Sequence, residues 1–218
     1  MSNTNNPKEC FDLRCSLPHE PDSFPIEYFE KPPERVARAL LGQWLFRQSS
    51  DGLAGGIIVE TEAYLAQGDP ACHAAVGPNR KNQSMFGSAG KAYVYVIHAR
   101  HCLNVVTERE GRGSAVLIRA LQPMCGIDIM SQRRGRSGDR DLTTGPARLC
   151  EALQVTRLLD GHDLTQPDAL WIQPSDIDPA TLNTRATIRT GVTSGQDMEL
   201  RFVIRRNSYV SGPKRLRM

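Results

Sequence analysis

The hydrophobic and polar positions of the segment AGGIIVETEAY, residues 54–64, alternate with the period of two that is typical of a β-strand. Long apolar side chains and a terminal tyrosine also favour a strand here. The alternation divides the segment into two faces, one with Glu60, Glu62 and Tyr64 and the other with Val59, Thr61 and Ala63. One strand face therefore carries two carboxylates and a phenol.

Similar patterns predict further elements on both sides of this strand. Strands are expected over residues 43–47, 92–98, 114–121, 171–172, 186–188 and 200–204. Helices are expected from Pro33, over residues 123–134 and from Pro146, because proline suits the first position of a helix. A charged loop is expected over residues 133–141. The long loop at 65–90 is rich in Gly, Pro, Asn and Asp, and such loops usually serve a function.

These elements predict an α+β fold, with one mixed domain around a curved, mainly antiparallel β-sheet and peripheral helices. A chain of 218 residues fits one such domain, which we expect over residues 23–218. Residues 1–22 are polar and are expected to form a flexible arm. No apolar run is long enough to cross a membrane and no secretory signal is recognisable. We therefore expect neither a membrane span nor secretion.

Composition adds two constraints. The six cysteines are scattered without a CxxC pair, which indicates reduced, intracellular thiols and disfavours a cysteine-based metal site. Only five of the 27 basic residues are lysines. The arginine excess favours phosphate binding because guanidinium groups match phosphate geometry. A genome rich in GC codons would produce the same excess, and composition alone does not separate the two explanations.

Glu62 is the first candidate for chemistry. It lies in a good core strand, and the following loop brings His73 after Tyr64. A carboxylate, an imidazole and a phenol near one strand end are suitable groups for general-base catalysis. The alternative is a half-exposed strand with an ordinary acidic face, which the pattern alone favours.

Two other segments do not fit a plain core. Arg119 interrupts the apolar run SAVLIRAL and needs a partner if it is buried; Glu60, Glu62 or a phosphate would serve. Tyr93 and Tyr95 share one face of the strand YVYVIH, where they offer aromatic planes for a base. Tyrosines are also common in strands for packing alone.

The sequence lacks the motifs of several enzyme classes. The phosphate-binding loop, the dinucleotide fingerprint, HExxH, GxSxG and the zinc-deaminase pattern are all missing. His98 and His101 have no third ligand at a useful spacing, so we expect no metal site and no cofactor.

Seven segments together carry a resemblance to a known family. They are VARALLGQWL (36–45), IIVETEAYLAQGDPACH (57–73), KNQSMF (81–86), AYVYVI (92–97), CLNVV (102–106), AVLIRALQP (115–123) and TGPARLCEAL (144–153). In this order and spacing the sequence resembles the alkyladenine, or 3-methyladenine, DNA glycosylase family of the mammalian type. The resemblance runs from about Phe24 to the C-terminal strands.

The resemblance implies a role for each matching residue. Glu62 corresponds to the general base that holds the attacking water, and Arg119 to the arginine beside it. Residues implied to surround the flipped base are Tyr64, His73, Tyr93, Tyr95 and Asn104, of which Tyr64 and Tyr95 sandwich it and Asn104 crowds a guanine amino group.

One position departs from the family. The family's tyrosine that wedges into the DNA falls in a run that reads His98-Ala99-Arg100-His101 here and is one residue short. His98 or a shifted neighbour is therefore the candidate wedge. Other candidates for phosphate contacts are Arg80, Lys81, Arg133, Arg134, Arg136 and Arg140.

The implied function is base-excision repair of duplex DNA that contains damaged purines such as 3-methyladenine, by a monomeric hydrolase that leaves an abasic site. Such a protein would act in the cytoplasm or nucleoid of a bacterium or in a eukaryotic nucleus. A non-catalytic damaged-DNA binding protein on the same scaffold is the alternative, and intact Glu62, Arg119 and Tyr64 argue against it. An amine-nucleophile lyase is disfavoured because the ETEAY strand has no lysine.

Overall fold

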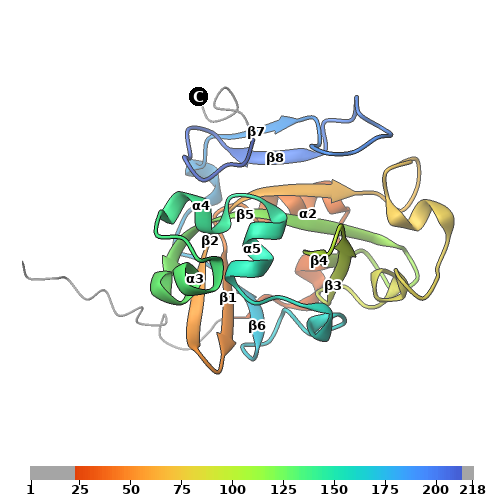
Figure 1. Ribbon diagram of the computed structural model, residues 1–218. Coiled ribbons are helices and arrows are strands. Elements are labelled where there is room, and N and C mark those ends of the chain that lie inside the picture. The colour runs from red at the N-terminus through yellow and green to blue at the C-terminus, as the bar shows by residue number, and fades with distance from the viewer. Residues whose placement is uncertain (1–22, 213–218) are drawn as a thin grey trace, which may run out of the picture.

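The longest strand, β2 (Gly52–Tyr64), lies at the centre of a curved eight-stranded sheet in the computed structural model, which describes residues 23–212 (Figure 1). The other strands are β1 (Trp44–Ser49), β3 (Ala92–Ile97), β4 (Arg100–Thr107), β5 (Ser114–Cys125), β6 (Leu170–Gln173), β7 (Thr184–Thr187) and β8 (Arg201–Ile204). The α-helices are α1 (Ile26–Phe29), α2 (Pro33–Ala39), α3 (Ile127–Arg134), α4 (Asp139–Thr143) and α5 (Pro146–Ala152). Short 3₁₀ helices are η1 (His73–Val76), η2 (Gln83–Phe86), η3 (Arg157–Leu159) and η4 (Pro179–Thr181). The predicted α+β class is confirmed, and the predicted arm at 1–22 lies outside the described residues.

The sheet divides along one edge of β2. Its order is β3-β4-β5-β2-β1-β6, with every pairing antiparallel. On one side β2 pairs with β5 over most of its length. On the other side its first half pairs with β1, whereas Glu60, Thr61 and Glu62 pair with β8. The two carboxylates therefore lie where β2 changes partners, between β5 and β8.

The strict alternation predicted for β2 is wrong at one point. Val59 packs with Ile57 in a small second cluster, whereas Thr61 donates a hydrogen bond to the carbonyl of Ala37 in α2 and Ala63 packs in the main core. The pairing with β5 is irregular on both sides of Glu60. A β-bulge of this kind changes which face the following side chains occupy.

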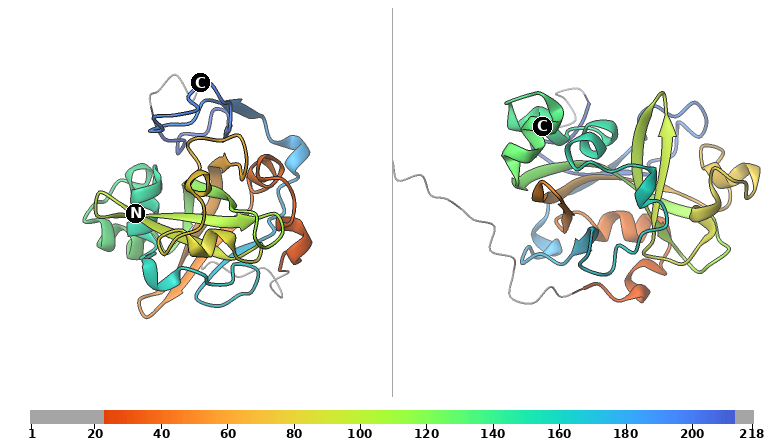
Figure 2. Two further views of the ribbon diagram at one scale, coloured as in Figure 1. Left: turned by 90° about the vertical axis from the view of Figure 1, so that its right-hand side faces the viewer. Right: turned by 60° about the horizontal axis from the view of Figure 1, so that its bottom comes forward.

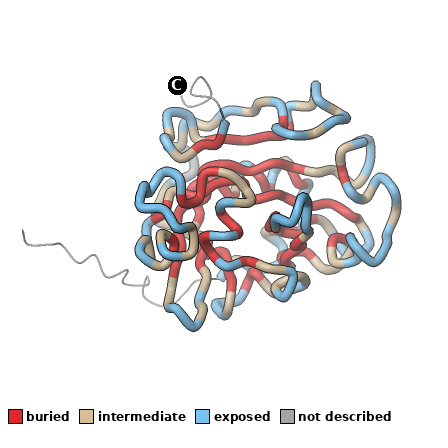
Figure 3. Tube along the Cα trace, in the orientation of Figure 1, coloured by how far each residue is buried: buried red, intermediate tan, exposed pale blue. Residues whose placement is uncertain are grey.

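The main core joins the sheet to the helices. Val36 of α2 and Leu149 of α5, with Leu40 and Leu153 directly after these helices, pack in one cluster with buried side chains of β2, β4 and β5. Figure 3 shows the buried tube running through the central strands and the exposed tube along the loops. This rigid centre supports the residues that project from β2 and β5.

The helix predicted over 123–134 begins later than expected. β5 continues through Pro123 to Cys125, and α3 starts at Ile127. The continuation depends on Gly56, where a Cβ atom would lie 2.1 Å from the carbonyl oxygen of Gln122. Only glycine permits that approach of the two strands. The pairing is irregular between Gly55 and Gly56, which accommodates the proline.

Three elements were missed by the sequence patterns. β4 follows β3 through a turn of two residues, α1 precedes the first predicted helix, and α4 begins within the loop predicted over 133–141 and ends beyond it, at Thr143. The hydrogen-bonded pair formed by β3 and β4 projects from the body of the molecule in yellow-green (Figure 2). Within residues 23–212, no helix is both long and apolar enough to cross a membrane.

Candidate active site

The Glu62 carboxylate is fully buried, accepts two hydrogen bonds and forms an ion pair. The Tyr64 hydroxyl donates to its Oε2 atom at 2.9 Å, and the Thr190 backbone N–H donates to its Oε1 atom at 2.8 Å. Arg119 Nη1 lies 3.2 Å from Oε2. A carboxylate offers about four acceptor positions, so one remains for a further donor such as a water molecule.

Arg119 connects the two carboxylates of β2. Its Nε atom donates to Glu60 Oε1 at 2.8 Å, while its Nη1 atom faces Glu62. Burial opposes the charge of Arg119, but Glu62 and Glu60 hold its pKa above the ordinary value. The sequence predicted that Arg119 needs a buried partner, and it has two.

A cavity of about 230 Å³ opens beside Tyr64, whose hydroxyl donates to Glu62, and it is lined in part by aromatic side chains. Tyr64, Tyr93 and Tyr95 lie on its walls with His73 and Asn104, so the five predicted base-binding residues come together. The remaining lining residues are Pro70, Ala71, Met85, Ile97, Gly191, Val192, Thr193 and Ser194. The cavity combines flat apolar walls with a few fixed polar groups, as small-ligand sites commonly do.

The aromatic residues hold one another in place. His73 Nδ1 lies 2.7 Å from the Tyr93 hydroxyl, and the His73 ring packs edge-on against Tyr95 with centroids 4.6 Å apart. The Tyr93 and Tyr95 centroids are 5.6 Å apart. Asn104 donates from Nδ2 to the Tyr93 carbonyl across the β3–β4 pair. The wall is thus rigid before any ligand enters.

The shifted pKa values of the lining residues keep the cavity walls uncharged. Burial raises the pKa of Tyr64, and the neighbouring Glu62 carboxylate raises it further. Burial likewise raises the pKa of Tyr93 and of Tyr95, and partial burial lowers the pKa of His73. At neutral pH the phenols therefore remain protonated and the imidazole remains neutral.

A buried ion pair lies beside Tyr64, behind the cavity wall. Arg189 binds Asp69 through two hydrogen bonds of 2.6 and 2.7 Å, and neither side chain is exposed. The guanidinium carbon of Arg189 also lies 4.8 Å from the centre of the Tyr64 ring. This pair joins the loop after β7 to the loop after β2, and it places the Thr190 N–H against Glu62.

The predicted wedge residue lies at the tip of the β3–β4 pair. His98 and Ala99 form the two-residue turn, with φ angles of 48° and 59°. Positive φ at both positions is the geometry of a tight type I′ hairpin. His98 is exposed, beside Val96 and Ile97, which are 50% and 49% exposed.

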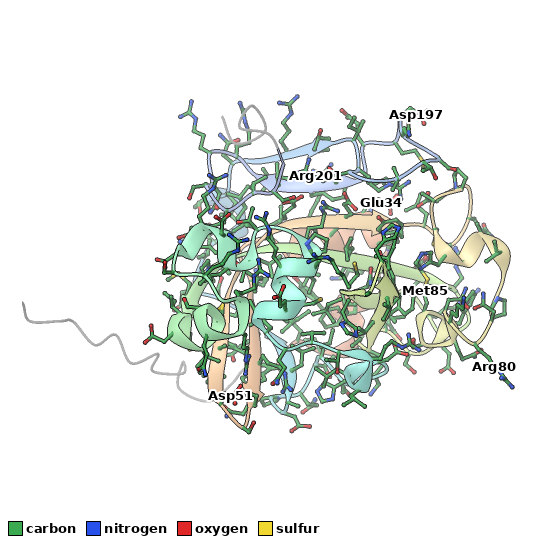
Figure 4. The ribbon with its side chains drawn as sticks, viewed as in Figure 1. Glu34, Asp51, Arg80, Met85, Asp197 and Arg201 are labelled. Carbon is green, nitrogen blue, oxygen red and sulfur yellow. The ribbon has the colours of Figure 1, made fainter. Side chains whose placement is uncertain are left out.

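The candidate phosphate-binding residues fall in two places. Arg80 and Lys81 are exposed and line a groove next to the cavity, and Figure 4 shows Arg80 at the far end of the molecule from Asp51. Arg133 binds Asp51 at 2.8 Å, and Arg134 pairs with Glu151. Arg136 follows α3 and is exposed, whereas Arg140 donates to the carbonyl of Ser208.

Sequence reasoning missed four contributors: three buried side chains, those of Asp69, Arg189 and Arg201, and the backbone N–H of Thr190. The signal for Arg201 was available, because it interrupts the apolar run LRFVI in the way that Arg119 interrupts SAVLIRAL. Asp69 and Arg189 gave no such signal, since each lies in a polar segment. Over the described part of the chain, no three His, Cys, Asp or Glu side chains gather in a way that would hold a metal ion.

The comparisons with known proteins agree with this geometry. The methylpurine-DNA glycosylase family profile matches residues 27–208. A protein of Rhodopirellula baltica is 46% identical over 87% of this chain and 83% of its own length. Proteins of Carboxydothermus hydrogenoformans and Methanoculleus marisnigri are 44% and 42% identical over 86% and 87% of this chain and 97% and 98% of their own lengths. All three are named as 3-methyladenine DNA glycosylases. The chain therefore belongs to the methylpurine-DNA glycosylase family.

Proposed function

We propose that this DNA glycosylase flips an alkylated purine such as 3-methyladenine out of duplex DNA and hydrolyses its N-glycosidic bond, with Glu62 as the general base. The observation that carries the proposal is the buried Glu62 carboxylate, which accepts a hydrogen bond from Tyr64 on the wall of the cavity. The names of the relatives support the choice of base. As the family resemblance implies, the proposal includes action as a monomer on DNA inside the cell.

The chemistry suits these residues. The C1′ atom of the sugar becomes oxocarbenium-like as the bond to the base breaks. Glu62 takes a proton from the attacking water at its free acceptor position, and its negative charge stabilises the developing cation. Arg119 and the Tyr64 hydroxyl fix the orientation of the carboxylate. Flipping is needed because the bond is inaccessible inside the base stack.

The aromatic walls favour an alkylated base. Alkylation places positive charge on the purine ring, which makes the base a better leaving group. Such a ring also stacks favourably on the electron-rich faces of Tyr64 and Tyr95. Damaged bases cost less to unpair than normal ones, and this adds selectivity before the base reaches the cavity.

The test compares wild-type protein with Glu62→Gln in base release from methylated duplex DNA. We expect the variant to lose cleavage rate by about 100- to 10,000-fold, which is the usual contribution of general-base catalysis, while its affinity for DNA persists. Glu27→Gln, an exposed substitution on α1, is the matched control. Release by Glu62→Gln at the wild-type rate would overturn the catalytic assignment. Binding of damaged DNA without release by the wild type would favour the non-catalytic alternative.

A further inference from the structure

We propose that Arg201 and Glu60 are positioning residues for the reaction, in which Arg201 neutralises Glu60 so that Arg119 remains directed at Glu62. The inference rests on the proposed role of Glu62. Glu62 bonds to Tyr64 of the cavity wall, whereas the hydrogen bonds of Glu60 within residues 23–212 go to Arg119, Arg201 and Ser211, none of which lines the cavity. Neither Arg201 nor Glu60 is therefore expected to touch the substrate.

The contacts form a continuous chain from β8 to the site. Arg201 Nε lies 2.7 Å from Glu60 Oε1, and Arg119 Nε lies 2.8 Å from the same oxygen. Arg119 Nη1 then lies 3.2 Å from Glu62 Oε2. Each of the four side chains is at most 8% exposed, so water does not screen their charges.

Ser211 completes the surroundings of Glu60. Its backbone N–H donates to Glu60 Oε2 at 2.6 Å and its hydroxyl to Oε1 at 2.9 Å, while its carbonyl accepts from Arg201 Nη2 at 2.8 Å. Burial would raise the pKa of Glu60, but Arg119 and Arg201 outweigh burial and hold that pKa below its usual range. Glu60 is therefore a charged group, and its charge needs a partner other than Arg119.

The four charges balance when all are present. Glu60 and Glu62 carry two negative charges, and Arg119 and Arg201 carry two positive charges. If Arg201 is removed, two buried carboxylates compete for one guanidinium, which already lies closer to Glu60 than to Glu62. Arg119 is then drawn toward Glu60, and an uncompensated negative charge remains in the protein interior. Glu62 loses part of the contact that orients it.

The fold explains why this arrangement occurs at one place. β2 exchanges β1 for β8 beside Glu60, so Arg119 of β5 and Arg201 of β8 approach it from opposite edges. Figure 4 places Arg201 on β8, in the upper layer of the molecule. Because β2 has β8 as its second neighbour at this point, Glu60 contacts the guanidinium of Arg201 as well as that of Arg119.

The test is a cycle of substitutions measured by single-turnover cleavage, with affinity for damaged DNA and thermal melting recorded for every variant. Arg201→Met is expected to slow cleavage by about 10- to 100-fold, in the range of couplings between contacting residues, with little change in affinity. The double variant Glu60→Gln with Arg201→Met removes one charge of each sign and leaves Arg119 for Glu62. We expect it to cleave at least about fivefold faster than Arg201→Met.

A merely structural role predicts the opposite order, because loss of two members of a network damages it more than loss of one. A double variant that cleaves no faster than Arg201→Met would therefore overturn the proposal, as would wild-type cleavage by Arg201→Met. If Arg201→Met does not fold, Arg201→Lys keeps the charge. It is expected to cleave within about fivefold of wild type, and a larger loss would overturn the proposal.

Two controls separate this inference from the proposed function. Arg185→Met makes the same change at an exposed position of the neighbouring strand β7 and is expected to leave cleavage unchanged. Glu62→Gln tests the reaction itself. Activity of Glu62→Gln would overturn the proposed function, whereas an inactive Glu62→Gln combined with no recovery in the double variant would overturn only the role of Arg201 and Glu60.

Discussion

The charged groups behind the cavity and the tip of the β3–β4 pair differ in their exposure to solvent. Behind the cavity, Glu60, Glu62, Arg119 and Arg201 are buried and held by hydrogen bonds and ion pairs. At the tip, residues 96–100 are exposed. The difference fits the proposed roles, in which the reaction uses groups in fixed positions and DNA is engaged by side chains that are exposed in the free protein.

The two regions also differ in how much a substitution should cost. A buried charge that loses its partner must be desolvated without compensation. An exposed side chain that is shortened loses little in the free protein, and its effect appears only when DNA is bound. The following predictions test this contrast, in order of decreasing effect.

Removal of the partner of Arg189 should have the largest effect on stability. Asp69→Ala leaves the buried Arg189 guanidinium without its two hydrogen bonds, and we expect the free energy of unfolding to fall by about 3–5 kcal/mol. Denaturant unfolding measures this loss. The control is Asp197→Ala, an exposed substitution in the β7–β8 loop that also contains Arg189. It should change stability by less than about 0.5 kcal/mol.

The same pair predicts the direction of a pH dependence. Burial opposes the Asp69 charge, but Arg189 and the backbone N–H groups of Leu65 and Ala71 hold its pKa below the ordinary value. The resulting stabilisation is present above the unfolded pKa and is lost as the pH falls through the folded one. Asp69→Asn should therefore lose less stability on acidification than wild type. An equal loss would contradict this origin of the acid sensitivity.

The cavity walls should show an intermediate effect. Tyr64→Ala and Tyr95→Ala should each weaken capture of the flipped base by about 1–3 kcal/mol, the usual value of stacking on an aromatic side chain. Fluorescence of a base analogue in DNA measures the flipping equilibrium. Tyr95→Phe keeps the ring and should flip like wild type. Normal flipping by both alanine variants would mean that the base binds elsewhere.

The hairpin tip should show a smaller, pH-dependent effect. If His98 fills the gap in the duplex, a protonated imidazole beside phosphates should tighten flipping as the pH falls, by roughly 0.2–1 kcal/mol as for an exposed ion pair. The flipping equilibrium is measured between about pH 5.5 and 8, across the range in which imidazoles titrate. His98→Ala should abolish the dependence, while Arg100→Ala and His101→Ala should retain it. Identical curves for His98→Ala and wild type would exclude His98 as the wedge.

Chelation should have no effect. The chain carries no recognisable metal motif, and the proposed reaction uses only protein groups and water. Base release in excess EDTA should therefore equal release in its absence. Loss of activity that zinc or magnesium restores would contradict a metal-independent mechanism.

The sequence by itself determined the elements whose patterns are strong and local. The alternation at 54–64 predicted β2, and Arg119 inside an apolar run predicted a buried ion pair before any partner was known. The family resemblance then grouped Glu62 with Tyr64, His73, Tyr93, Tyr95 and Asn104. The structure places the last five around one cavity, with Glu62 hydrogen-bonded to Tyr64 behind its wall. The helix start predicted at Pro123 is wrong. The preference of proline for the first helical position is a local rule, whereas β5 continues through Pro123 because Gly56 allows β2 to approach it closely.

Only the tertiary structure decided which distant residues serve the site. Arg189 and Asp69 are 120 positions apart, and Arg201 and Glu60 are 141 positions apart. Their pairing depends on where β8 joins β2, which no local pattern contains. The physical reason is that periodicity records which face of an element is buried, whereas the partner of a buried charge is set by the long-range packing of that face.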